Sequence, residues 1–243
     1  MSPVSVVTPL DNLQYLLYND IHVMSRIVPT KPLLVLLYGF PGSGKTFFAR
    51  QLSESLGAAH VQSDRIRSEL FEQPRYDQRE NVIVSRLLDY MTEEFLNAGV
   101  SVVYDVNAAR LAKRRVLRDL ARKAHIQPIL VWLQIDADSS FDRAVKRDRR
   151  HNDDKYAMNL DRTTFDAMIG QMQNPGRDED YIVISGKHTF GTQQSAITKR
   201  LHELGLITSD EAKTNVVKPE LVNLIPKAIG GRVDLTRRNI MIR

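Results

Sequence analysis

The chain has 243 residues, of which 42% are hydrophobic, and carries a formal net charge of +5 with no cysteine. A chain of this size can bury a real core, so we expect a globular protein with one α/β domain and an appendage. The absence of cysteine excludes disulfides, thiolate metal sites and thiol nucleophiles, which leaves oxygen or imidazole ligands and makes Mg²⁺ the expected metal. No apolar run approaches the ~20 residues that span a bilayer, and the N-terminus lacks the basic-then-apolar pattern of a signal peptide. We therefore expect a cytoplasmic protein without a membrane partner.

The N-terminal segment, residues 1–30, has a helical pattern of its own. Leucine, isoleucine and methionine recur at helical spacing over residues 9–28, and Pro29 and Pro32 interrupt the pattern. This spacing predicts a helix that packs on the main domain and ends before the prolines. We expect its role to be structural.

The strongest motif is GFPGSGKT at residues 39–46, between an apolar run at 33–38 and a predicted helix over 45–56. A glycine-rich turn in this context aims backbone N–H groups at one point, where the helix dipole adds positive potential. A glycine turn beside a solvated lysine is the weaker reading, because the pattern occurs in the strand–loop–helix context that a phosphate loop requires. We predict ATP and Mg²⁺ as cofactors. The predicted nucleotide-binding residues are Gly39, Pro41, Gly42, Ser43, Gly44, Lys45, Thr46 and Phe47, of which Lys45 is also catalytic and Thr46 also a metal ligand.

From this motif to residue 186, strand patterns alternate with helical patterns. This alternation implies a parallel sheet with right-handed crossovers and helices on both faces, which is a three-layer α/β/α sandwich. We place this domain at residues 31–186. Further strands are expected at 58–62, 100–104, 129–135 and 181–185, and further helices at 65–71, 78–98, 110–124, 139–149 (capped by Asp138) and 162–173.

The segment QSDRIR, residues 62–67, follows the second strand. Asp64 can accept the proton of an attacking hydroxyl group, and Arg67, one turn into the next helix, can hold a phosphate or carboxylate of the acceptor. The alternative is that Asp64 caps that helix and Arg67 is a surface cation. These residues alone favour the alternative.

The segment SVVYDVN, residues 101–107, ends an apolar strand in Asp105. In sheets of this kind, the strand beside the phosphate loop carries an acidic residue that supports Mg²⁺, so Asp105 is a candidate metal residue. A helix-capping aspartate is the alternative. We expect Asn107 to position Asp105 or to contact the substrate.

The segment FDRAVKRDRRHNDD, residues 141–154, is strongly basic and leads into an aperiodic polar stretch. Arginines on a closing lid neutralise the charge that develops between the β- and γ-phosphates. The alternative to a lid is a cationic helix face in contact with solvent. We expect most of the cations here to be solvated in this way. We assign Arg147 and Arg150 as candidate catalytic residues and Arg149 as a candidate nucleotide contact.

These motifs together resemble the P-loop kinases related to the bacteriophage polynucleotide 5′-hydroxyl kinase domain. That wider group, often labelled AAA-type ATP-binding domains, includes zeta-toxin-like and small-metabolite kinases. The resemblance rests on GFPGSGKT, DRIR, YDVN before a basic helix, and the KRDRR lid, and it covers residues 33–186. It implies a P-loop NTPase fold whose five-stranded sheet has the order 2-3-1-4-5. It also implies that Asp64 is the general base, that Arg67 holds the acceptor and that Asp105 supports the metal.

The C-terminal extension, residues 187–243, holds the excess of positive charge. It contains ten Lys/Arg and five Asp/Glu. A helix is expected over 192–204 and a small strand pair after residue 231. The basic extension favours a polyanionic partner such as nucleic acid, while an ordinary solvated surface is the more frequent explanation of such charge.

The leading interpretation is an ATP-dependent phosphotransferase, a kinase that acts on a hydroxyl group. A polynucleotide 5′-end requires a basic groove and aromatic stacking, whereas a nucleoside, sugar or amino-sugar nucleotide requires a closed pocket. Both acceptors stay open. A regulatory ATPase that switches a partner-binding tail is an alternative of another class, but Asp64 and Arg67 argue against it because a switch needs no acceptor base. The sequence leaves the acceptor and the oligomeric state undetermined.

Overall fold

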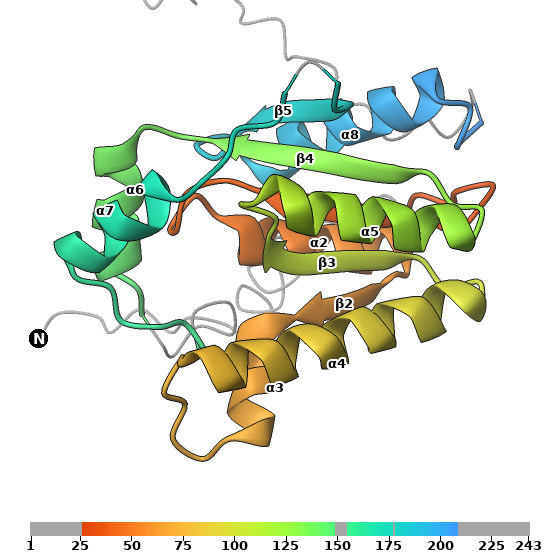
Figure 1. The fold of residues 1–243 in the computed structure, drawn as a ribbon. Coiled ribbons are helices and arrows are strands. Elements are labelled where there is room, and N and C mark those ends of the chain that lie inside the picture. The colour runs from red at the N-terminus through yellow and green to blue at the C-terminus, as the bar shows by residue number, and fades with distance from the viewer. Residues whose placement is uncertain (1–25, 149–154, 177, 209–243) are drawn as a thin grey trace, which may run out of the picture.

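The centre of the computed structural model is a five-stranded sheet with the strand order β2-β3-β1-β4-β5 (Figure 1). All neighbouring strands are parallel. The structure describes residues 26–148, 155–176 and 178–208. The predicted parallel sheet and its strand order are therefore confirmed. The strands are β1 (Leu34–Tyr38), β2 (Ala59–Gln62), β3 (Val102–Asn107), β4 (Pro128–Gln134) and β5 (Tyr181–Ser185).

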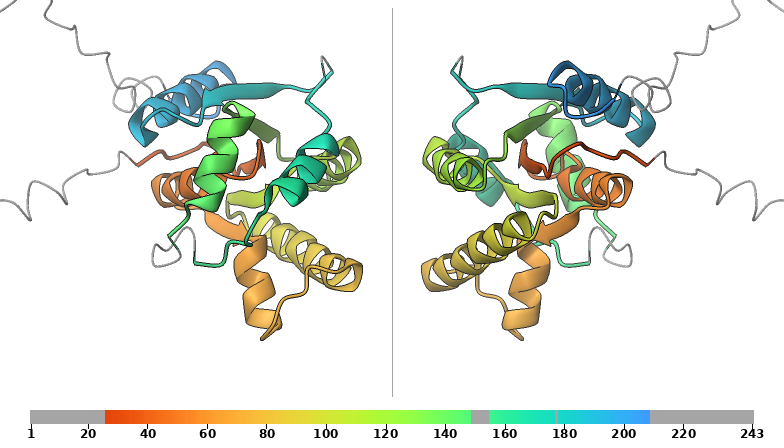
Figure 2. Two further views of the ribbon diagram at one scale, coloured as in Figure 1. Left: turned by 90° about the vertical axis from the view of Figure 1, so that its left-hand side faces the viewer. Right: turned by 90° about the vertical axis from the view of Figure 1, so that its right-hand side faces the viewer.

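Helices cover both faces of the sheet, which confirms the three-layer sandwich (Figures 1 and 2). On one face lie α2 (Lys45–Leu56) and α8 (Phe190–Glu203), and on the other lie α4 (Gln78–Asn97) and α5 (Leu111–Lys123). Helix α3 (Ser63–Leu70) follows the edge strand β2. Helices α6 (Ala137–Val145) and α7 (Arg162–Gly170) lie across the end of the sheet, as the left view of Figure 2 shows. No helix within the described residues combines the length and hydrophobicity that a membrane crossing requires.

Strand β1 is buried along its whole length because both of its faces are covered. Val35 and Leu37 belong to the core beneath α2 and α8, whereas Leu34 and Leu36 belong to the core beneath α4 and α5. Successive side chains of a strand point to opposite faces of the sheet. A strand covered on both faces therefore appears in the sequence as an uninterrupted apolar run.

Helix α8 shares the core of the sheet. Ile197 and Leu201 are buried in the same cluster as the inner residues of α2 and β4. Beyond the helix, the carbonyl oxygen of Leu206 accepts a hydrogen bond of 2.8 Å from the backbone N–H of Thr30. The expected domain boundary at residue 186 thus falls inside a single packed unit. The helix predicted over residues 9–28 and the strand pair predicted after residue 231 lie outside the described residues, apart from residues 26–28, which are not helical.

Helix α6 differs from the prediction at both ends. It begins at Ala137, and its cap is Asp136, which accepts a hydrogen bond of 2.8 Å from the N–H of Ser139. The prediction that Asp138 caps this helix was wrong, because Asp138 instead pairs with Arg162 at 3.0 Å. The helix ends at Val145 rather than at residue 149. Arg147 consequently lies beyond the helix, on the segment that leads away from it.

Strand β3 runs further than predicted, so Asp105 lies inside the strand and not after it. The pairing of β1 with β3 passes from Leu36↔Tyr104 to Leu37↔Asn107, and Asp105 pairs with Gln62 of β2. Val103, two residues earlier, faces the core beneath α2. By alternation, Asp105 points to the same side as the beginning of α2.

A buried ion pair fastens α5 to the segment before β5. The Arg114 side chain is only 1% exposed, and its Nε and Nη2 atoms donate hydrogen bonds of 2.8 and 2.7 Å to the Glu179 carboxylate. Its Nη1 atom donates to the carbonyl oxygens of Ala108 and Gln173. These bonds to Arg114 hold the pKa of Glu179 below its ordinary value. Although Arg114 lies on a basic helix, its charge is therefore neutralised by a buried carboxylate and does not reach the surface.

We expect Arg114→Met to lower the free energy of unfolding by about 3 kcal/mol, because it leaves the Glu179 carboxylate buried with Arg118, at 3.4 Å, as its remaining ion-pair partner. Since folding depresses the pKa of Glu179, the stabilisation is present above the ordinary value of 4.5 and is lost as the pH falls. Urea unfolding at pH 7 and at about pH 3 measures both effects. The exposed Arg122→Met on the same helix is the control and should change little. Equal stability of the two variants would contradict this account.

Candidate active site

The loop between β1 and α2 is held by helix α6. A Cβ atom on Gly42 would collide with the carbonyl oxygen of Ser140, and the Ser140 hydroxyl donates a hydrogen bond of 2.7 Å to the Pro41 carbonyl oxygen. Gly42 also has a φ of 86°, a backbone conformation that side chains rarely adopt. Glycine at this position therefore allows α6 to approach the loop and to fix its path.

The beginning of α2 presents backbone donors that suit an anion. The first N–H groups of an α-helix have no acceptor within the helix, and none of the described side chains caps α2. Gly44 turns the chain into the helix with a φ of 93°. Because an added Cβ would meet no atom within 4 Å, it is this backbone conformation and not a lack of space that favours glycine here. The Ser43 hydroxyl is buried and has no hydrogen-bond partner among the described residues. This combination of donors fits a polyphosphate group.

Lys45, the first residue of α2, folds back over the loop. Its Nζ atom donates hydrogen bonds of 2.9 and 2.7 Å to the carbonyl oxygens of Gly39 and Phe40. Burial lowers the pKa of Lys45 to about 8, with Asp105 and Asp64 opposing the shift and Arg147 adding to it. The ammonium group thus lies against the glycine-rich loop itself. Phe47 is 43% exposed on the first turn of α2.

Asp105 joins three elements at this edge of the sheet. One of its carboxylate oxygens lies 3.4 Å from the Thr46 hydroxyl of α2, and the other lies 3.1 Å from Nε2 of His60 on β2. No group of three or more His, Cys, Asp or Glu side chains within the described ranges is placed to hold a metal ion. A hydroxyl, one carboxylate and nucleotide phosphates are nevertheless a set of oxygen ligands that suits Mg²⁺. Thr46 and Asp105 are the residues that would support it.

Asp64 lies in the first turn of α3 and is half-buried. Burial and the negative charge of Asp105 raise its pKa, while Arg67, Arg147 and Lys45 oppose the rise. These electrostatic effects show that residues from four separate segments lie near one another. The structure therefore brings together the predicted base, the phosphate-loop lysine, the candidate metal residue and one candidate lid arginine.

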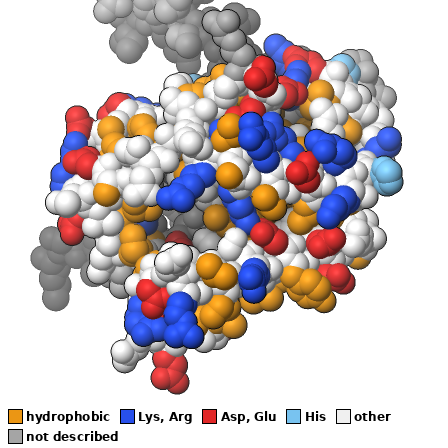
Figure 3. Space-filling view, in the orientation of Figure 1, with side chains coloured by type: hydrophobic (Ala, Val, Ile, Leu, Met, Phe, Trp, Pro, Cys, Tyr) orange, Lys and Arg blue, Asp and Glu red, His pale blue; other side chains and the backbone are white. Residues whose placement is uncertain are grey.

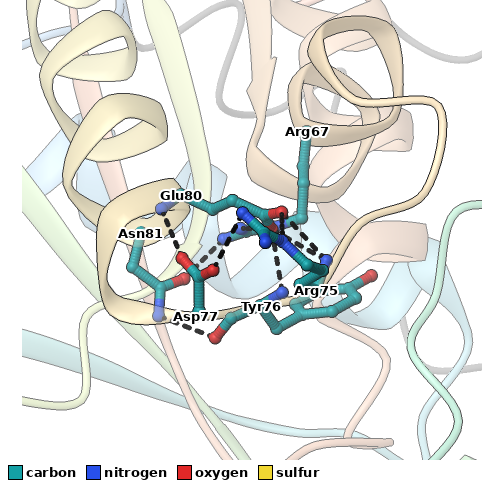
Figure 4. A network of polar contacts seen from close by, with 6 residues as sticks. All are labelled: Arg67, Arg75, Tyr76, Asp77, Glu80 and Asn81. Atoms are coloured by element: carbon teal, nitrogen blue, oxygen red, sulfur yellow. Dashed lines mark hydrogen bonds and ion pairs between the residues drawn. The ribbon is translucent and has the colours of Figure 1, made fainter.

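Arg67 is not a surface cation. Its side chain is 7% exposed, and its Nη1 and Nη2 atoms donate hydrogen bonds of 3.1 Å to Glu80 and 2.6 Å to Asn81 (Figure 4). The guanidinium also lies over the Tyr76 ring, at 4.6 Å from its centroid. The Nε atom is buried without a partner among the described residues. Direct contact with an acceptor, as predicted for Arg67, would require this nitrogen or an exchange of the present partners.

Glu80 is the centre of the network around Arg67. Besides that guanidinium, its carboxylate accepts hydrogen bonds from the backbone N–H groups of Arg75 and Tyr76 (Figure 4). Burial opposes ionisation, yet these bonds hold the pKa of Glu80 below its ordinary value. Asp77 caps α4 by accepting a hydrogen bond of 2.9 Å from the N–H of Glu80. The network ties α3, the following loop and α4 into one unit.

Of the remaining predicted site residues, the structure describes Arg147 and Asn107 but not Arg149 and Arg150. Arg147 is close enough to Lys45 and Asp64 to lower the pKa of both, and it lines a cavity of about 200 Å³ with Met158 and Asn159. Arg149 and Arg150 lie outside the described residues. At the end of β3, Asn107 Nδ2 lies 3.9 Å from the sulfur of Met172, and its Oδ1 atom is buried without a described partner. Within the described residues, no hydrogen bond joins Asn107 to Asp105.

Sequence reasoning missed His60, Glu80 and Asn81. His60 stands in a short strand of mixed character, and nothing in its spacing indicates that it meets Asp105. Glu80 and Asn81 lie on a helix with many charged residues, where a solvated position is the ordinary expectation. Only the pairing of β2 with β3 and the packing of α3 on α4 reveal these contacts.

Residues 34–175 match the family model described as AAA domain. No curated protein matches the chain. A putative kinase from Chloroflexus aurantiacus j-10-fl is 15% identical with a TM-score of 0.55, over 72% of this chain and 98% of that one. Kti12 from Chaetomium thermophilum, in complex with ADP-AlF3, is also 15% identical with a TM-score of 0.55, over 72% and 99% of the two chains. A gluconokinase from Sinorhizobium meliloti 1021 is 14% identical with a TM-score of 0.53, over 72% and 96%.

At these levels of identity the solved structures show the fold, which is that of P-loop kinases. The family model spans more than half of the chain and includes the phosphate loop, Asp64 and Asp105. The protein therefore belongs to the AAA domain family of P-loop proteins.

Proposed function

We propose that this protein is an ATP-dependent kinase that transfers the γ-phosphate of ATP to a hydroxyl group of an acceptor. The observation that supports the proposal is that Asp64 lies in the first turn of α3, two residues after Gln62, which pairs with Asp105, and that the charges of Asp105, Arg147 and Lys45 act on it. A nucleotide-binding site alone accounts for Lys45 and Asp105. It does not account for a half-buried carboxylate on α3 in the same electrostatic environment, which suits the activation of an acceptor.

In this proposal, Asp64 takes the proton of the acceptor hydroxyl as its oxygen bonds to the γ-phosphorus. The bond from that phosphorus to the oxygen bridging the β- and γ-phosphates breaks, and ADP leaves. Lys45 and the N–H groups at the start of α2 bind the phosphate oxygens and stabilise the charge that develops. Mg²⁺, held on the Thr46 and Asp105 side, supplies further charge neutralisation when it is bound. In the same proposal, Arg147, whose charge acts on Lys45, is the candidate lid arginine that stabilises this charge.

The assignment as a kinase is tested by transfer of labelled γ-phosphate from ATP. The full chain is incubated with a panel of 5′-hydroxyl RNA and DNA, nucleosides, sugars and amino-sugar nucleotides. Labelling of one class of acceptor supports the proposal and identifies the acceptor. ATP hydrolysis without any labelled acceptor would favour the regulatory ATPase.

We also propose that the protein is cytoplasmic and that its basic C-terminal extension binds nucleic acid.

Lys45→Ala should lower the rate of ATP turnover by roughly 10²–10³-fold, the usual effect of removing a group that stabilises transition-state charge. The fold should persist, because among the described residues the Lys45 side chain donates hydrogen bonds only to carbonyl oxygens of its own loop. Steady-state turnover and urea unfolding measure the two effects, with the exposed Lys31→Ala as the control. Turnover at the unmodified rate in the Lys45 variant would remove the phosphate loop from the mechanism.

Asp64→Asn should cut phosphoryl transfer by roughly 10²–10⁴-fold, the usual contribution of a positioned base, and leave ATP affinity within a few-fold. Because the pKa of Asp64 is raised, the unmodified protein should lose transfer activity on acidification at a higher pH than an ordinary aspartate would cause. The residual activity of Asp64→Asn should lack that acid limb. A pH–rate profile of kcat/KM for both proteins is the measurement, and identical profiles would assign the base to another group.

His60→Ala should raise the Mg²⁺ concentration needed for half-maximal ATP binding by roughly tenfold or more. The reason is that His60 orients the Asp105 carboxylate. The readout is the affinity for ATP, measured across a Mg²⁺ titration without any acceptor. His60→Gln keeps a side-chain donor and should recover part of the loss, while the exposed His188→Ala should behave as the unmodified protein. An unchanged titration for His60→Ala would show that Asp105 needs no such support.

A further inference from the structure

A surface groove lies between α4 and the beginning of α5, on the face seen in Figure 3, where the surface is hollowed and bordered by basic side chains. Its volume is about 550 Å³. Helix α4 contributes most of its lining, and the residue just before α5 contributes the rest. The lining residues are Gln78, Asn81, Val82, Ser85, Arg86 and Arg110.

The chemistry of this lining is that of an anion site. Two guanidinium groups, two amides and one hydroxyl face the groove, and none of the six lining residues is acidic. Arg86 forms no hydrogen bond or ion pair with any residue in the described ranges. Arg110 donates a hydrogen bond of 2.8 Å to Gln171, a neutral amide. The nearby Lys113 differs, because Asp89 neutralises it at 2.6 Å. Both groove arginines thus keep their charge available for a ligand.

The groove adjoins the acceptor side of the candidate active site. Asn81, which lines it, accepts the hydrogen bond from Arg67, and the charge of Arg67 acts on Asp64. Arg110 comes three residues after Asn107, the last residue of β3. The groove is therefore connected to the proposed base through α3 and α4, and to the strand that carries Asp105 through the start of α5.

We propose that this groove binds a phosphate group carried by the acceptor, so that the substrate is a phosphate ester with a free hydroxyl. The inference rests on the proposed kinase function and narrows its acceptor. Two arginines suit a phosphate because each planar guanidinium pairs two N–H groups with two of its oxygens. The exposed Val82 offers an apolar contact for the organic part of the ester. Either a small phosphorylated metabolite or the first phosphodiester of an oligonucleotide supplies this group.

The test uses two pairs of probes that differ only in the phosphate. The first pair is a short 5′-hydroxyl oligonucleotide and its uncharged methylphosphonate analogue, and the second is adenosine 3′-phosphate and adenosine. Affinities are measured with the full chain in the presence of a non-hydrolysable ATP analogue. In at least one pair, the phosphate-bearing member should bind at least tenfold more tightly than the neutral one. If the oligonucleotide pair shows this difference, the acceptor is an oligonucleotide, and if the adenosine pair shows it, the acceptor is a small phosphate ester.

Arg86→Gln and Arg110→Gln should each weaken that binding by at least tenfold, because each removes a charged hydrogen-bond donor. Arg79→Gln, an exposed arginine on the same helix outside the groove, is the matched control and should bind within twofold of the unmodified chain. Unchanged affinity for the ATP analogue confirms that the variants are folded. Equal binding of charged and neutral probes in both pairs, or unchanged binding by both groove variants, would overturn the proposal.

Phosphate transfer to the same probes separates this inference from the kinase assignment. Binding that depends on Arg86 and Arg110, without transfer of labelled phosphate, supports the groove and rejects the kinase. Transfer whose KM for the acceptor is the same in the unmodified chain and in both variants rejects the groove and retains the kinase. Transfer with a KM raised at least tenfold in the variants, and kcat within a few-fold, supports both.

Discussion

The candidate site depends on one carboxylate that three elements share. Asp105 of β3 meets Thr46 of α2 through one oxygen and His60 of β2 through the other. In a parallel sheet, the carboxyl ends of all strands lie along one edge, so a residue near the end of a central strand is within reach of its neighbours. The register of β2 and β3 places Gln62 opposite Asp105, which carries α3 and Asp64 to the same edge. Movement of this carboxylate would therefore disturb its contacts with both α2 and β2.

The region around Arg67 is built from buried charge. Arg67 and Glu80 are both removed from water, and each is compensated by several hydrogen bonds. Breaking a buried pair leaves an uncompensated charge, so such a pair tends to hold its elements in one arrangement. Here that arrangement fixes the loop at Arg75–Asp77 against α4 and holds one wall beside Asp64. The electrostatic influence of Arg67 on Asp64 follows from this fixed position and does not depend on a bound acceptor.

The use of positive charge differs from one basic residue to the next. Arg114 forms a buried ion pair with Glu179, and Lys113 forms an ion pair with Asp89. Arg86 and Arg110 line the surface groove between α4 and the start of α5, where no described acidic side chain pairs with them. A count of basic residues along α4 and α5 therefore overstates the charge that a ligand can meet. The distinction between paired and unpaired cations is therefore a property of the folded chain and not of its composition.

Much of the fold follows from local patterns in the sequence. The apolar run of β1, the glycines of the phosphate loop and the helix beginning at Lys45 predict a strand, a turn and a helix without any knowledge of distant contacts, and the structure agrees at those residues. Where a boundary depends on a single cap, the prediction was less secure, since Asp136 and Asp138 are equally good caps in sequence and only the start of α6 distinguishes them.

The sequence by itself determined the class of fold and a phosphate loop with a lysine and a threonine in place, because these rest on spacing and on glycine geometry. It did not determine that Arg67 is buried against Glu80, that His60 meets Asp105, or that α8 completes the core. Each of those contacts joins residues that belong to different helices or strands. Whether a charged residue is solvated or paired depends on which helix packs beside it, and only the tertiary structure decides that packing.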